Sequence, residues 1–288
     1  MPALLDPADD LSPRPAAPRR VRPYARTVRG TGPAGLLLAH GAAGSVEENY
    51  GPLMAALTAG HRVVGVDYPG TGGTPRADGP LELDELAGEL LAAADAEGLE
   101  RFALCGFSLG GAVAIRIAAR HPERVTALVL TAPFPYADTE LRLASRVWLA
   151  LGRGGDPDTL GRFALSRALG SDALAALDPR TADDLARRTG ATSPAGMPEQ
   201  VDLALRVDVR EDLAAIGAPT LVISPTGDLL VPPRLHRATA AGIPGARLLE
   251  IPGGHVPFAD DPARWGGVIV PFLTEVAGAA GGRPEAGG

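Results

Sequence analysis

The chain has 288 residues, a formal net charge of −7 and 45% apolar residues, which fits one compact domain with room for an inserted subdomain. Its charges are spread rather than gathered in blocks, which argues against nucleic acid as a partner. All 27 basic residues are arginine, so chemistry that needs a Schiff-base lysine, such as that of pyridoxal phosphate, is excluded. The single Cys105 allows no internal disulfide, and no cluster of Cys and His predicts a metal site. We therefore expect neither cofactor nor metal.

The first 20 residues do not resemble a signal peptide. Residues 1–20 are rich in Pro, Arg and Asp and lack the apolar run of a signal peptide. No stretch of the sequence is long and apolar enough to span a membrane. We expect a cytoplasmic protein with no membrane partner, and we expect residues 1–20 and 278–288 to be disordered.

Strand-like and helix-like segments alternate as in a mostly parallel, twisted sheet with helices on both faces. Strands are predicted near residues 22–29, 35–39, 62–67, 101–107, 125–131, 219–224 and 246–251. Helices are predicted near residues 46–59, 83–97, 109–120, 232–241 and 261–276. This order predicts an α/β core formed by residues 21–134 and 213–277. Residues 135–212 show helical patterns broken by Gly and Pro, and they predict a helical lid inserted into that core.

The strand predicted at 35–39 leads into a loop of small residues, 40–45. Small side chains let the backbone approach a ligand closely, so we expect the amide of Ala42 to donate to a developing oxyanion, with Ala43 as the second choice. His40 lies at the end of the strand and precedes the candidate nucleophile. We expect it to hydrogen-bond the loop rather than to act as a base.

Residues 101–111 place Gly-x-Ser-x-Gly between an apolar strand and a helix. A strand that turns sharply into a helix at Ser108 exposes its hydroxyl in a strained backbone conformation. Gly106 and Gly110 stand where a side chain would collide with neighbouring backbone. The amide of Leu109, directly after the serine, is the other expected oxyanion donor. This context predicts a nucleophilic serine.

An acid and a histidine are expected to follow the serine in chain order. His255 comes after the strand predicted at 246–251, on a glycine-rich loop that lets its ring swing over a neighbouring strand end as a general base. Asp228 lies in the turn after the strand predicted at 219–224, where its carboxylate can orient that histidine. His236 lies near the start of a predicted helix and is interpreted as a surface residue.

These motifs resemble those of the α/β-hydrolase fold, in particular its lid-bearing esterases, thioesterases and acyl-transfer enzymes. The resemblance rests on His40-Gly41, on Asp67-Tyr68-Pro69-Gly70-Thr71-Gly72, on Gly106-Phe107-Ser108-Leu109-Gly110-Gly111, on Gly227-Asp228 and on Gly253-Gly254-His255. It covers nearly all of the chain. It implies the fold and a catalytic triad of Ser108, Asp228 and His255, but it implies no substrate.

The predicted lid holds the substrate information that the sequence offers. The apolar residues expected to line a pocket are Phe107, Phe134, Trp148, Phe163 and Met197. An apolar pocket indicates a hydrophobic acyl or alcohol group, although the same side chains could instead pack the lid onto the core. The lid also carries arginines, any one of which could meet a substrate carboxylate or phosphate, although most fit solvated helix faces: Arg142, Arg146, Arg162 and Arg206.

The sequence thus predicts a serine hydrolase that acts on a hydrophobic ester or thioester, free or carrier-bound, through an acyl-enzyme on Ser108. Three alternatives stay open: an acyltransferase or cyclase of small-molecule biosynthesis, a hydrolase of carbon–carbon bonds, and a non-catalytic ligand-binding protein. A haloalkane dehalogenase or an epoxide hydrolase is disfavoured, because these would need an aspartate at the nucleophile position. The sequence leaves the oligomeric state open.

Overall fold

A computed structural model describes residues 23–281, so the predicted leader 1–20 and residues 282–288 lie outside it. The strands are β1 (Arg26–Arg29), β2 (Ala34–Ala39), β3 (His61–Val66), β4 (Phe102–Phe107), β5 (Val125–Thr131), β6 (Thr220–Pro225) and β7 (Arg247–Ile251). They form a seven-stranded sheet in the order β1-β3-β2-β4-β5-β6-β7. Only β1 runs antiparallel to its neighbour; every other pairing in the described sheet is parallel.

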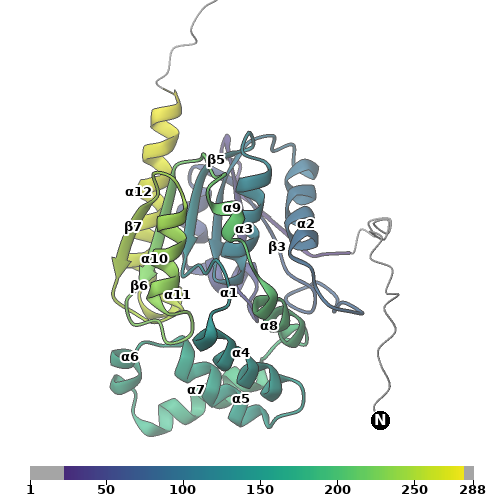
Figure 1. The fold of residues 1–288 in the computed structure, drawn as a ribbon, viewed down its shortest axis with the longest axis vertical. Coiled ribbons are helices and arrows are strands. Elements are labelled where there is room, and N and C mark those ends of the chain that lie inside the picture. Colours follow the sequence, from purple (N-terminus) through teal and green to yellow (C-terminus); the bar gives the residue numbers. More distant parts are fainter. Residues whose placement is uncertain (1–22, 282–288) are drawn as a thin grey trace, which may run out of the picture.

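Helices cover both faces of this sheet (Figure 1). The core helices are α1 (Val46–Thr58), α2 (Leu83–Ala96), α3 (Leu109–Arg120), α10 (Pro233–Gly242) and α12 (Pro262–Gly281), with the short α9 (Arg210–Leu213) and α11 (Pro257–Asp260). Apolar residues of α2, α3 and α10 pack on one face, and those of α1 and α12 pack on the other.

The strand residues divide between the two faces by strict alternation. In β2, Leu37 belongs to the core under α2 and α3, whereas Leu36 and Leu38 belong to the core under α1 and α12. In β4, Leu104 and Cys105 divide in the same way. Because successive side chains point to opposite faces of a strand, a central strand covered on both faces must be apolar at every position.

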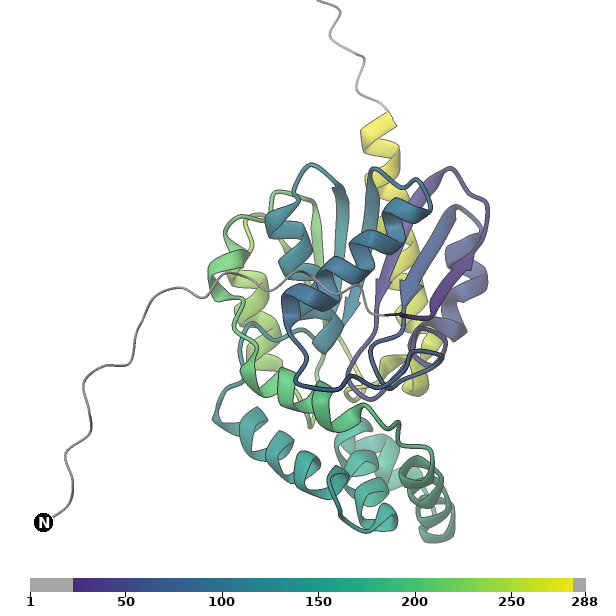
Figure 2. The ribbon, with the colours of Figure 1, turned by 90° about the vertical axis from the view of Figure 1, so that its right-hand side faces the viewer.

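A helical insertion separates β5 from β6. It consists of α4 (Thr139–Gly152), α5 (Pro157–Ala168), α6 (Ser171–Ala176), α7 (Pro179–Ala191) and α8 (Met197–Arg206). Both α5 and α7 begin with Asp-Pro, and in each case the aspartate accepts hydrogen bonds from the first turn while the proline supplies the helical φ. Two views related by a 90° turn place α4 to α7 as a layer at one end of the sheet (Figures 1 and 2).

Two boundaries differ from the sequence-based expectation. The first strand starts at Arg26 rather than at residue 22, because the backbone leaves the sheet at Ala25, whose amide donates to Thr74 Oγ1 at 2.8 Å. The last helix continues to Gly281, into the tail that the sequence predicts as disordered from residue 278. Once a helix is nucleated, each further residue adds a hydrogen bond, so Ala277, Ala279 and Ala280 extend this helix even though Gly278 does not favour it.

Helix α3 starts in direct contact with the end of β2. A Cβ placed on Gly110 would lie 2.1 Å from the carbonyl oxygen of Ala39, and one on Gly106 would lie 2.5 Å from the carbonyl oxygen of Gly110. Both distances are far inside van der Waals contact, so the turn between β4 and α3 requires glycine at both positions, as the sequence predicts. No helix among residues 23–281 is long and apolar enough to cross a membrane.

Gly110→Ala is expected to lower the free energy of unfolding by about 3 kcal/mol, because the new methyl group must displace the backbone of β2. Urea denaturation of the two proteins measures the difference. Gly267→Ala in α12 is the matched control, since a Cβ there meets no atom within 4 Å and alanine favours the helix. Equal stability of the Gly110→Ala variant and the wild type would contradict the contact.

Candidate active site

Ser108 occupies the turn between β4 and α3 in an unusual backbone conformation. Its φ of 52° and ψ of −118° lie outside the regions that non-glycine residues ordinarily adopt. The conformation is fixed by hydrogen bonds on both sides: the Ser108 amide donates to the carbonyl of Thr131 at 3.0 Å, and the amide of Gly111 donates to the carbonyl of Ser108 at 2.8 Å. Strain that is held in this way is frequent at functional sites.

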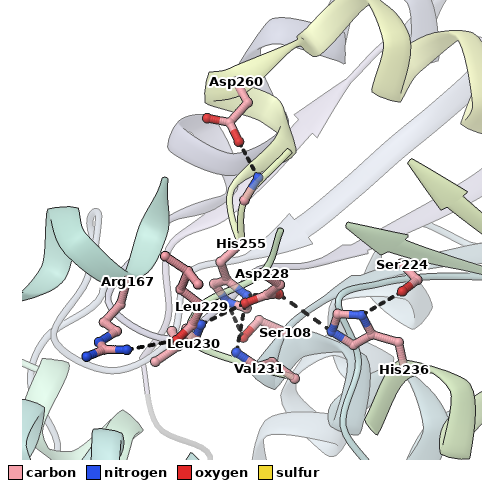
Figure 3. A network of polar contacts seen from close by, with 11 residues as sticks. Ser108, Arg167, Ser224, Asp228, Leu229, Leu230, Val231, His236, His255 and Asp260 are labelled. Atoms are coloured by element: carbon pink, nitrogen blue, oxygen red, sulfur yellow. Dashed lines mark hydrogen bonds and ion pairs between the residues drawn. The ribbon is translucent and has the colours of Figure 1, made fainter. Parts of the chain in front are cut away.

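His255 lies on the loop after β7 and bridges Ser108 and Asp228 (Figure 3). Its Nε2 lies 3.0 Å from Ser108 Oγ, and its Nδ1 lies 2.7 Å from Asp228 Oδ2. The three side chains, which the sequence spreads over 147 positions, thus form one hydrogen-bonded chain. All three are buried, and the ring of Phe107 packs against that of His255 with centroids 5.1 Å apart.

The loop that carries His255 is held by backbone contacts. The amide of Gly254 donates to Asp260 Oδ2 at 2.6 Å, and the amide of Gly227, next to Asp228, donates to the carbonyl of Gly253 at 2.9 Å. On its other side the loop touches the end of α5 in the insertion. A Cβ on Gly254 would lie 2.2 Å from the amide nitrogen of Gly170, so the two backbones meet without side chains between them.

Asp228 uses its two oxygens for different purposes. Oδ1 accepts from the amides of Leu230 and Val231, at 2.9 and 2.8 Å, and thereby closes the turn after β6. Oδ2 faces His255. Because two backbone amides hold Oδ1, the orientation of the carboxylate is fixed, and Oδ2 is placed to accept a hydrogen bond from His255 Nδ1. The lone pair of Nε2 then faces the hydroxyl of Ser108.

His236 is not the surface residue that the sequence suggests. Its side chain in α10 is 0% exposed; Nδ1 lies 3.0 Å from Ser224 Oγ, and Nε2 lies 3.5 Å from Asp228 Oδ2 (Figure 3). Burial lowers the pKa of His236 to about 4, against a smaller opposing effect of the Asp228 charge. The prediction failed because α10 turns this position toward β6, and the helical pattern alone does not indicate which side of a short helix is covered.

The loop after β2 supplies the amides expected to form an oxyanion site. The amide of Ala43 donates to Gln200 Oε1 of α8 at 2.8 Å, so Ala43 is not a free donor. Among residues 23–281, the amide of Ala42 has no acceptor, and neither has the amide of Leu109 at the start of α3. Ala42 also lines the cavity beside Ser108. The geometry therefore favours Ala42 over Ala43, in the order that the sequence predicts.

His40 has the structural role expected from its position. Its Nδ1 lies 2.7 Å from the carbonyl oxygen of Gly41, to which it donates, and its Nε2 accepts from the amide of Tyr68 at 2.9 Å. Both ring nitrogens are thus used by the backbone. Complete burial lowers the pKa of His40 to about 4, so the ring stays neutral in the folded protein at neutral pH.

A cavity of about 280 Å³ opens beside Ser108 and His255, with walls from the core loops and from the insertion. Of the predicted lining residues, Phe107, Trp148 and Phe163 do line it. Phe134 and Met197 do not: both are almost completely buried, Phe134 in the core beneath the sheet and Met197 among the helices of the insertion. Their apolar character indicated that both side chains are buried, but not whether they line the cavity or pack in the interior.

The lid arginines singled out from the sequence lie outside this cavity. Arg162 lies near Asp183 at 3.6 Å, Arg206 contacts Asp202 and Glu82, Arg142 donates to a backbone carbonyl, and Arg146 is exposed. Within residues 23–281, the arginine that lines the cavity is Arg167, which no pattern in the sequence distinguishes. Only its neighbours in space distinguish it from the others.

Gln200 is a second residue that the sequence did not reveal. It is completely buried, and besides accepting from Ala43 it donates through Nε2 to the carbonyl of Pro69 at 3.0 Å. One side chain of the insertion thereby fixes two loops of the core. Because its partners lie 157 and 131 positions away, no local pattern could indicate this role.

Comparisons with known proteins agree on one fold. A family model described as the alpha/beta hydrolase fold matches residues 36–262. The pyrrolizixenacetamide deacetylase of Xenorhabdus hominickii is 35% identical over 85% of this chain and 92% of its own. The pimeloyl-[acyl-carrier protein] methyl ester esterase of Neisseria meningitidis is 29% identical over 82% and 75%. The crystal structure of the enol-lactonase from Burkholderia xenovorans matches with a TM-score of 0.77 and 25% identity, over 88% of this chain and 100% of that one.

Gln200→Met is expected to lower the free energy of unfolding by about 2 kcal/mol, because it leaves the buried carbonyl of Pro69 and the half-buried amide of Ala43 without their partner. Thermal or urea unfolding measures this loss. Leu203→Met, at another buried position of α8, removes no hydrogen bond and serves as the control, with an expected cost of less than about 1.5 kcal/mol. Equal costs for the two variants would rule out the bridging role.

The buried histidines make stability fall in acid. The unfolded chain binds a proton on each of His40 and His236 below about pH 6.5, whereas the folded protein, with pKa values of about 4, does not, so stability is lost as the pH falls from 6.5 toward 4. Between about pH 7.5 and pH 5, each of the two histidines is expected to lower the free energy of unfolding by about 2 kcal/mol.

Urea unfolding of the wild type and of His236→Asn at several pH values tests this effect. Over the same pH range, the free energy of unfolding of the variant is expected to fall by about 2 kcal/mol less than that of the wild type, whatever the stability of the variant at neutral pH. His121→Gln, at a side chain that is 42% exposed, is the control and should keep the wild-type slope. If the stability of His236→Asn depended on pH as steeply as that of the wild type, His236 would take up its proton in the folded protein over the same pH range as in the unfolded chain.

Proposed function

The chain belongs to the alpha/beta hydrolase family and is a hydrolase, and from that premise we propose that it cleaves a small carboxylic ester or thioester through an acyl-enzyme on Ser108. The observation that carries the proposal is the buried chain from Ser108 Oγ through His255 to Asp228, with contacts of 3.0 and 2.7 Å. The strained backbone of Ser108 at the edge of the cavity supports it.

The first half of the reaction forms the acyl-enzyme. His255 Nε2 accepts the Ser108 proton while Oγ attacks the acyl carbon, and Asp228 stabilises the imidazolium that results. The amides of Leu109 and Ala42 donate to the oxyanion, and each such donor contributes about 3 kcal/mol to the stability of the transition state. His255 then returns the proton to the leaving group, and the first product departs.

The second half releases the acid. A water molecule in the cavity gives its proton to His255 Nε2 and attacks the acyl carbon, and Ser108 recovers its proton when the tetrahedral intermediate breaks down. The names of the deacetylase and the methyl ester esterase among the relatives support water as the acceptor, in preference to the amine or thiol of an acyltransferase. The mainly apolar cavity supports a hydrophobic acyl or alcohol group of modest size.

Incubation with a fluorophosphonate followed by intact-mass measurement tests the proposal. The wild type is expected to gain one adduct and Ser108→Ala none, because the reagent requires a serine activated by its histidine. Turnover of p-nitrophenyl esters should vanish in the same variant, while its unfolding curve stays that of the wild type. A folded wild-type protein that gains no adduct and cleaves no ester would refute the acyl-enzyme and favour a ligand-binding protein on this fold.

A further inference from the structure

One cation lines the cavity beside Ser108. Arg167 belongs to the last turn of α5, and its side chain lies beside the turn after Asp228 (Figure 3). Its Nη1 donates to the carbonyl of Leu229 over a long 3.4 Å, and its guanidinium carbon lies 5.8 Å from the centre of the Phe163 ring. These contacts hold the guanidinium at the cavity wall without neutralising its charge.

Arg167 differs in this respect from the arginines that are buried to a similar degree. Within the described chain, Arg62, Arg116 and Arg124 are also half-buried, and each of them contacts a carboxylate. Arg167 forms no ion pair with any residue of 23–281. An arginine that is partly withdrawn from water is usually paired with an opposite charge, and Arg167 departs from that rule within the described chain.

The other two nitrogens of Arg167, Nη2 and Nε, have no acceptor among the described residues. Nη2 makes no hydrogen bond to any described residue, and Nε is enclosed by protein atoms without a partner. Among residues 23–281, the carboxylate that lines the cavity is that of Glu48, which is exposed and accepts from Ser45 Oγ at 3.1 Å in the cap of α1. Arg167 therefore places a positive charge at one wall of the cavity, and no carboxylate of the described part of the chain forms an ion pair with it.

We propose that the substrate carries a carboxylate group besides its scissile ester, and that Arg167 binds this carboxylate. This inference rests on the proposed function, because it concerns the substrate of the same site. A planar guanidinium matches the geometry of a carboxylate. In a small cavity with mainly apolar walls, such a contact favours anionic substrates over neutral ones of the same shape. The substrate class is thus a small ester or thioester that is apolar around the reacting carbon and anionic at one end.

Two pairs of matched esters test the inference and locate the charge. Mono-p-nitrophenyl glutarate and p-nitrophenyl valerate differ by a carboxylate in place of a methyl group at the end of the acyl chain. The 3-carboxyphenyl and 3-methylphenyl esters of butyric acid differ in the same way on the leaving group. For each pair, the measured quantity is the ratio of kcat/KM for the anionic ester to kcat/KM for the neutral ester.

In at least one pair this ratio is expected to fall by about 100-fold in Arg167→Gln relative to the wild type, as the loss of a charged hydrogen-bonded contact implies. Arg167→Lys keeps the charge but not the planar group, so an intermediate ratio is expected. Arg162→Gln is the matched control, because Arg162 lies on the same helix, outside the cavity and near Asp183. It should keep the wild-type ratio and the wild-type activity.

Equal ratios in the wild type, Arg167→Gln and Arg167→Lys for both pairs would overturn the inference while leaving the proposed function intact, provided that the neutral esters are cleaved. A folded wild type that cleaves none of the esters and gains no fluorophosphonate adduct would overturn both. If Arg167→Gln does not fold, the inference is tested by inhibition instead. The inhibition constants of free glutarate and of neutral valeramide are measured for the wild type and for Arg167→Lys. Equal inhibition by the two compounds would then overturn the inference.

Discussion

The contact on which the site depends is that between the start of α3 and the end of β2. Gly110 brings the helix against the carbonyl of Ala39, closer than any side chain would allow. Ser108, directly before this helix, has a positive φ of 52°. Since β2 continues directly into the loop that contains Ala42, the same contact sets the spacing between the serine and both free amides. One backbone packing therefore positions the hydroxyl of Ser108 and the amides of Ala42 and Leu109, which are the proposed nucleophile and oxyanion donors.

The helical insertion completes a site that the core alone would leave loose. Gln200 holds the loop before α1 and the loop after β3 together, and Arg167 and Ala168 contact the loops that carry Asp228 and His255. Each of these contacts is a single hydrogen bond to a backbone group. Preorganisation of this kind matters because a catalytic dipole acts without reorganisation only if its support is rigid.

Much of the fold and of the candidate site could be predicted from the sequence, because both produce local patterns of residues. Glycines at fixed offsets mark the turn at Ser108, and apolar runs mark strands that are buried on both faces. The residues missed or misplaced are those whose roles depend on partners far away along the chain. His236 and Phe134 lie in amphipathic or apolar segments whose covered side only the packing reveals. Gln200 and Arg167 resemble ordinary polar helix residues until the neighbours of their polar atoms are known.

The contact between Gly170 and Gly254 ties the insertion to the loop of His255. Because backbone touches backbone there, and because Val256 donates to Ala168 nearby, the end of α5 cannot move without moving the loop of His255. The same constraint extends to α7, because the backbones of α5 and α7 also meet without side chains between them. A Cβ on Gly161 of α5 would lie 1.8 Å from the carbonyl oxygen of Ala186, and one on Gly190 of α7 would lie 1.9 Å from that of Pro157. The cavity wall at Thr189 of α7 is therefore linked through glycine contacts to the loop that carries His255.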